Sequence, residues 1–133
     1  MRRRGFPGRG SAAVELALVL PLALLAALAL VQVGLVAKDS LVVIQAAREG
    51  AREAAVTTDD GRVREAALRG GGGLPEDRTE VEVVRAGTVG DPVTVIVRYR
   101  APMVVPFVEW LFPDEVTLSG TGTMRQETTG EES

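Results

Sequence analysis

The pattern of apolar and polar positions divides the chain into an apolar first part and a mixed second part. Leu16 to Ala37 form a run of 22 residues without a charged side chain, in which Gln32 is the one strongly polar residue. About 20 such residues cross the roughly 30 Å of hydrocarbon in a bilayer. We therefore predict a transmembrane helix at residues 11–37. Pro21 lies early in this helix and has no N–H group, so we expect a slight kink there but no break.

Charged residues on the two sides of the apolar run predict its orientation. Residues 1–10 contain four arginines and no acidic residue, whereas Lys38 and Asp39 cancel each other directly after the run. The positive-inside rule then places the N-terminus in the cytoplasm and the rest of the chain outside. A cleaved secretory signal peptide is the alternative, because Ala-Leu-Ala at residues 27–29 fits a small-x-small cleavage site. The apolar run continues beyond that tripeptide, which favours a single-pass span.

Helical spacing continues after the span, so we expect the membrane helix to extend outward as an amphipathic stalk. Its apolar positions are Leu41, Ile44, Ala47, Ala51, Ala54 and Ala55. Arginines and glutamates crowd the opposite side. The apolar face suits either contact with other subunits or packing on the chain's own C-terminal domain, and the pattern leaves both open.

A short second helix and a glycine-rich linker are predicted next. The sequence "TTDDG" at residues 57–61 ends the stalk and offers an aspartate N-cap for a helix that runs through Arg69. Stalk and second helix together occupy residues 38–69. The four glycines that follow lack the Lys-Ser/Thr pair of a phosphate-binding loop. We interpret them as a C-cap and the start of a flexible linker at residues 70–78.

Apolar positions then recur at every second residue, which predicts β-strands. A first run begins at Val81, and a second, at residues 93–99, follows the turn sequence "AGTVGDP". A third run lies at residues 116–124, where Gly120 and Gly122 lower its strand stability. Three antiparallel strands with one face covered by the helix are the minimum that buries a core. The predicted fold is therefore α+β: a long N-terminal transmembrane helix with an amphipathic extension, then a small three-stranded antiparallel sheet.

The predicted β domain at residues 79–125 contains one segment with two interpretations. The sequence "APMVVPFVEWLFPDE" holds Phe107, Trp110 and Phe112. These aromatic side chains either complete the small core or form an apolar patch that contacts the outer membrane leaflet or a partner subunit. The polar residues 126–133 are predicted to form a disordered tail.

Composition and charge narrow the range of functions. The chain of 133 residues contains no cysteine and no histidine, which removes thiol nucleophiles, imidazole bases and the commonest metal ligands. Its formal net charge of −3 argues against nucleic-acid binding, because phosphates need a basic face. The acids of the outward part stand at turns or in solvated pairs: Asp59, Asp60, Glu76, Asp77, Asp91, Glu109, Asp114 and Glu115. We therefore expect no enzyme activity, cofactor, metal or small-molecule substrate.

Gly10, Ser11 and Glu15 form a motif at the cytoplasmic edge of the apolar run. A charge inside a membrane helix costs roughly 2.5 to 3.5 kcal/mol, so this carboxylate needs a reason unless it lies at headgroup depth, where water reaches it. A basic leader ending in Gly10, then a small residue, a glutamate at the fifth position and an apolar helix resemble the processing site of type IV pilin-like proteins. The resemblance implies that a prepilin peptidase cleaves after Gly10. The Glu15 carboxylate can then pair with the new Ser11 amine of its own chain or with that of an adjacent subunit.

Within that superfamily the chain is similar to the TadE-like pseudopilins of tight adherence (Flp) pilus systems. The similarity rests on Gly10, on residues 14–18, on Pro21 and on "IQAAREGAREAAV" at residues 44–56. It implies a minor pseudopilin of the cytoplasmic (inner) membrane that works with a prepilin peptidase, other pilin-like subunits and a pilus assembly platform. It also implies that Glu15 governs maturation or subunit registry. The alternative is an uncleaved single-span membrane protein with an extracytoplasmic partner-binding domain.

Overall fold

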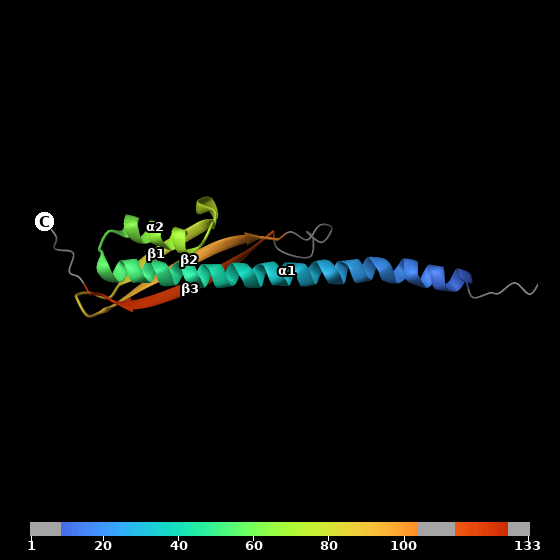
Figure 1. Cartoon of the computed structure of the whole chain (residues 1–133), viewed down its shortest axis with the longest axis horizontal. Coiled ribbons are helices and arrows are strands. Elements are labelled where there is room, and N and C mark those ends of the chain that lie inside the picture. The colour runs from blue at the N-terminus through green and yellow to red at the C-terminus, as the bar shows by residue number, and fades with distance from the viewer. Residues whose placement is uncertain (1–8, 104–113, 128–133) are drawn as a thin grey trace, which may run out of the picture.

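The computed structural model describes residues 9–103 and 114–127. In chain order the elements are α1 (Arg9–Val56), α2 (Asp60–Gly70), the 3-10 helix η1 (Glu76–Arg78), β1 (Thr79–Arg85), β2 (Pro92–Pro102) and β3 (Glu115–Arg125). Figure 1 shows α2 and the three strands beside the C-terminal half of α1, whereas the N-terminal half extends beyond these strands. This arrangement confirms the predicted α+β fold.

Helix α1 is continuous over 48 residues, which corresponds to about 72 Å at 1.5 Å per residue. It passes through Pro21 without a break, as the sequence predicts. Its N-terminal half exposes large apolar side chains from Val14 to Leu35, and they lie on every side of the helix. Among the described residues, α1 is the one helix long and apolar enough to cross a membrane.

The three strands form an antiparallel sheet in the order β1-β2-β3. Val97 in the central strand pairs with Val81 on one side and with Gly120 on the other. Alternate residues of β2 are buried on one face of the sheet. On the opposite, open face Arg98 and Glu82 form an exposed ion pair at 2.8 Å. The predicted strands and their one-sided burial are therefore confirmed.

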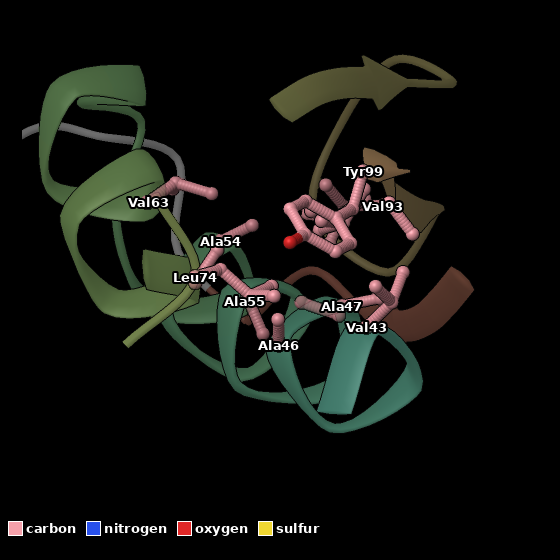
Figure 2. Close-up of a cluster of buried hydrophobic side chains, with 14 residues drawn as sticks. Val43, Ala46, Ala47, Ala54, Ala55, Val63, Leu74, Val93 and Tyr99 are labelled. Carbon is pink, nitrogen blue, oxygen red and sulfur yellow. The ribbon is translucent and has the colours of Figure 1, made fainter. Parts of the chain in front are cut away.

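The C-terminal half of α1 covers the buried sheet face with mostly small side chains. Its buried apolar side chains are those of Val43, Ala46, Ala47, Ala51, Ala54 and Ala55. Figure 2 shows side chains of this set gathered around Tyr99 and Val93 of β2. Of the two interpretations of the stalk face, packing on the chain's own domain is the one found. Leu41 takes no part in this packing and is 69% exposed, because the buried face is centred on Val43 and Ala47.

Two glycines let β3 lie directly against the backbone of α1. A Cβ atom at Gly120 would lie 2.7 Å from the carbonyl oxygen of Val43, and one at Gly122 would collide with the carbonyl oxygen of Ala47. Real Cβ atoms do not approach backbone atoms so closely. The intrinsic strand penalty of these glycines is thus offset by helix packing, which no larger residue permits at these positions.

Helix α2 is capped as predicted and packs across α1. The Asp59 carboxylate accepts the N–H of Gly61 at 2.9 Å, and the Gly71 N–H donates to the carbonyl of Ala67 at 2.9 Å. Gly50 in α1 allows the close crossing, since a Cβ there would lie 3.0 Å from the Cβ of Ala67. The small residue in the stalk therefore serves helix–helix packing.

Polar contacts tie the sheet to the end of α1. Arg85 of β1 donates to the Ala54 carbonyl at 3.1 Å and pairs with the Asp60 carboxylate at 2.7 Å. The Glu127 N–H donates to the Ala55 carbonyl at 2.8 Å. This last bond extends the fold past β3 into the range assigned to the tail.

Several sequence predictions fall outside the described residues. They concern most of the leader, at residues 1–8, and the end of the tail, at residues 128–133. The aromatic residues Phe107, Trp110 and Phe112 also lie outside, within residues 104–113. Their assignment to the core or to a contact surface stays a prediction.

Candidate functional site at the start of the membrane helix

The predicted processing site lies in the first turn of α1. Gly10 and Ser11 are the second and third residues of this helix, and both are exposed. Apart from its chain neighbours and its own helical turn, no atom of the described residues lies within 4 Å of a Cβ atom built at Gly10. The first four N–H groups of a helix have no partner inside it, so the backbone at such an end is weakly held. The Gly10–Ser11 peptide bond is therefore at an open helix end.

Glu15 faces Ser11 across one helical turn. The Ser11 hydroxyl Oγ donates a hydrogen bond to Oε1 of the Glu15 carboxylate at 3.2 Å. Residues four apart lie on the same side of a helix, which explains the contact. The structure thus brings together Ser11 and Glu15 of the sequence motif, whereas Pro21 lies further along the same helix.

Gln32 is a second distinctive residue of the apolar helix, and sequence alone assigns no role to it. Its side chain is 7% exposed, whereas those of Val31 and Val33 are 61% and 66% exposed. Its Nε2 donates to the thioether sulfur of Met103 at 3.6 Å. The signal in the sequence is a single polar residue in an uncharged run. The partner, 71 residues away, follows only from the fold.

Tyr99 is the ionisable group with a perturbed environment in the core. Burial raises the pKa of its hydroxyl above the ordinary 10.0, and the nearby Asp39 carboxylate raises this pKa further. The phenol therefore stays neutral at physiological pH. In this state it suits packing and not proton abstraction.

Two open grooves flank the turn after α2. The larger, of about 500 Å³, is lined by Glu49 and Arg52 of α1 and by Arg69 of α2, among others. The second, of about 420 Å³, lies beside Leu74 and Tyr99. Within residues 9–103 and 114–127, no three histidine, cysteine, aspartate or glutamate residues gather to hold a metal ion. The start of α1 carries the sequence motif and the Ser11–Glu15 hydrogen bond, and it is the candidate site considered below.

The exposed apolar helix and the small α+β domain beside its C-terminal half fit a single-pass membrane protein. Within this class, residues 10–52 match the model of the family described as TadE-like protein. This match confirms the resemblance seen in the sequence, and the family and the helix together fit a membrane protein associated with the Tad pilus. The match begins at Gly10 and covers most of α1, while the sheet lies outside it. No curated protein and no solved structure matches the chain significantly.

Proposed function

We propose that this chain is a TadE-like minor pseudopilin, a structural component of a tight adherence (Flp) pilus assembly, and not an enzyme. The observation that carries the proposal is the exposed Gly10–Ser11 bond at the start of a continuous helix, with Glu15 one turn further on. All three residues lie inside the range that matches the TadE-like family. In this proposal residues 1–10 are a leader, and a prepilin peptidase removes it on the cytoplasmic side.

The role of Glu15 follows from the chemistry of the new N-terminus. Cleavage would leave a cationic Ser11 amine at the start of a helix, where the helix dipole is already positive and disfavours a cation. A carboxylate one turn away offsets this cost. The 3.2 Å hydrogen bond from Ser11 to Glu15 supports the pairing, because it places the carboxylate within reach of residue 11. In an assembly the same carboxylate can pair with the amine of a neighbouring subunit and so set the registry.

The remaining parts of the chain take their roles from this arrangement. The N-terminus faces the cytoplasm, α1 crosses the inner membrane, and the sheet domain lies outside. Pro21 provides a slight kink within the span. Loss of the four leader arginines makes the mature chain more acidic. The partners are the prepilin peptidase, other pilin-like subunits and the assembly platform.

The test is the mass and N-terminal sequence of the protein extracted from membranes of cells with and without the prepilin peptidase. A start at Ser11 that depends on the peptidase is the expected result. An intact Met1 start in both strains would favour the uncleaved single-span protein with a partner-binding domain. A start at Leu30 would show a secreted protein released by signal peptidase.

Replacing Glu15 tests its role separately from cleavage. We expect Glu15→Ala to insert in the membrane but to lose co-purification with partner subunits, because the amine loses its carboxylate. Glu15→Asp should keep part of this association, and Val14→Ala, which alters an exposed apolar neighbour, should keep all of it. If Glu15→Ala still co-purified normally with partner subunits, Glu15 would have no role in registry. Its carboxylate would then simply lie at headgroup depth, in contact with water.

A further inference from the structure

The end of the β2–β3 strand pair lies beside the middle of α1, at Gln32. The last paired residues of these strands are Pro102 and Glu115, and the Met103 N–H donates to the Asp114 carbonyl at 3.1 Å just beyond them. The Met103 sulfur in turn accepts from Gln32. We refer to residues 102, 103, 114 and 115 as the strand end.

The rise along α1 and the rise along β3 both place the strand end at the level of Gln32. Gly120 of β3 lies against Val43, eleven residues after Gln32 along α1, or about 16 Å at 1.5 Å per residue. Glu115 precedes Gly120 by five residues, which is also about 16 Å at 3.3 Å per residue. The strand end and Gln32 are therefore at the same height along the helix.

This height limits how far the membrane can extend along α1. The described side chains of α1 on the N-terminal side of Gln32 are exposed, whereas Gln32 itself and, further along, Val43 and Ala47 are buried. A polar strand end with two carboxylates, Asp114 and Glu115, cannot lie in hydrocarbon without a large cost. The hydrocarbon must therefore end close to Gln32. From Ser11 to Gln32 the helix rises about 31 Å, enough to cross the roughly 30 Å of hydrocarbon. Glu15 then lies just inside the inner boundary, where its carboxylate accepts the hydrogen bond from Ser11.

We infer that the strand end rests on the outer surface of the membrane, in contact with lipid headgroups, and that Gln32 marks the hydrocarbon boundary. The embedded part of α1 is then residues 11–32, shorter than the transmembrane helix of residues 11–37 predicted from the sequence. Lipid is the partner because the exposed apolar surface of α1 reaches this level of the helix: Val33 and Leu35, one and three residues after Gln32, are 66% and 42% exposed. The inference rests on the membrane anchor of the proposed function.

The chain contains no cysteine, so single cysteines report on single positions in the full protein. Four variants carry an environment-sensitive fluorophore: Leu22→Cys in the span, Met103→Cys and Glu115→Cys at the strand end, and Val89→Cys in the β1–β2 turn at the other end of the sheet. Each is reconstituted in phosphatidylcholine vesicles whose spin label sits either in the headgroup or at mid-chain. Glu115 is exposed, so its replacement leaves the Gln32 contact intact.

We expect mid-chain labels to quench position 22 most strongly, headgroup labels to quench positions 103 and 115 most strongly, and neither label to quench position 89. Quenching at 115 no greater than at 89, with position 22 still quenched, would overturn this inference alone. Stronger mid-chain than headgroup quenching at 115 would also overturn it, because the strand end would then be inserted. An unquenched position 22 would remove the membrane anchor, and the proposed function with it.

Discussion

The two halves of α1 have the same backbone geometry but opposite relations between apolar side chains and burial. In the N-terminal half, large side chains such as Leu22 and Leu24 are 68% and 56% exposed. In the C-terminal half the buried positions are mostly alanine, and Ala47 and Ala51 are completely enclosed. The difference reflects the surroundings each half meets. Lipid chains accept bulky side chains on every side, whereas β3 approaches the α1 backbone so closely at Gly120 and Gly122 that only small side chains fit there.

The comparison shows that apolar content alone does not predict burial within the protein. The most apolar stretch of the chain has none of its residues buried by the domain. The less apolar stretch, interrupted by Arg48 and Glu49, supplies the helix side of the core. Side-chain size is therefore the better indicator of the face that the domain covers.

The largest expected effect comes from placing a charge in the exposed half. Leu22→Lys should reduce membrane insertion, because a lysine near the centre of a span costs about 2.5 to 3.5 kcal/mol. The matched control is Val56→Lys at the other end of α1, where the side chain is 50% exposed and outside the span. Carbonate extraction of membranes measures the difference. Equal extraction of both variants would mean that the N-terminal half does not lie in lipid.

The next effect comes from enlarging a small residue in the covered half. Ala47→Leu should destabilise the domain by about 1 to 3 kcal/mol, because Ala47 is fully enclosed and its backbone already touches Gly122. Ala27→Leu makes the same change where the helix is exposed, and it should have little effect. Denaturant unfolding of the full chain in detergent micelles compares the two. If Ala27→Leu cost as much as Ala47→Leu, the contrast between the halves would be lost.

The sequence predicts the helices and strands of this fold well, but it predicts poorly how they pack against one another. The length of the uncharged run predicts the membrane helix, and the alternation of apolar and polar residues predicts the strands. Asp59, the N-cap, predicts the start of α2. Each of these signals is local. Gly120 and Gly122, by contrast, are unfavourable for a strand when considered locally, and their use depends on where α1 crosses.

The contacts of the membrane helix also include one that the sequence predicts and one that it does not. The Ser11–Glu15 contact follows from a spacing of four residues in a helix, so the sequence predicts it. The role of Gln32 depends on Met103, which lies far along the chain, and no periodicity links the two. Leu41 also shows the limit, because its helical spacing fits the apolar face although the domain leaves it exposed.

A smaller effect is expected from the polar contacts that hold the covered half. Arg85→Ala should destabilise the domain by about 1 to 2 kcal/mol, since the Ala54 carbonyl loses a charged donor and Asp60 loses its cation. Arg64→Ala removes the same charge from an exposed position of α2 and serves as the control. Denaturant unfolding again gives both values. A stability loss equal in the two variants would show that net charge matters and the contact does not.

The smallest effect is the pH dependence that Tyr99 adds to the covered half. Its pKa in the folded protein is raised, first by burial and then by Asp39, so the unfolded chain releases this proton more readily. Tyr99 therefore contributes stability that is fully present below pH 10 and declines as pH rises through the folded pKa.

Tyr99 is the single tyrosine of the chain, so phenolate absorbance reports its titration directly. In Asp39→Asn the titration should shift to lower pH while staying above the ordinary value, because desolvation by the alanines of α1 persists. A titration at the ordinary pKa would mean that α1 does not cover this end of the sheet closely. That result would remove the contrast between a helix half in contact with lipid and a half sealed by protein.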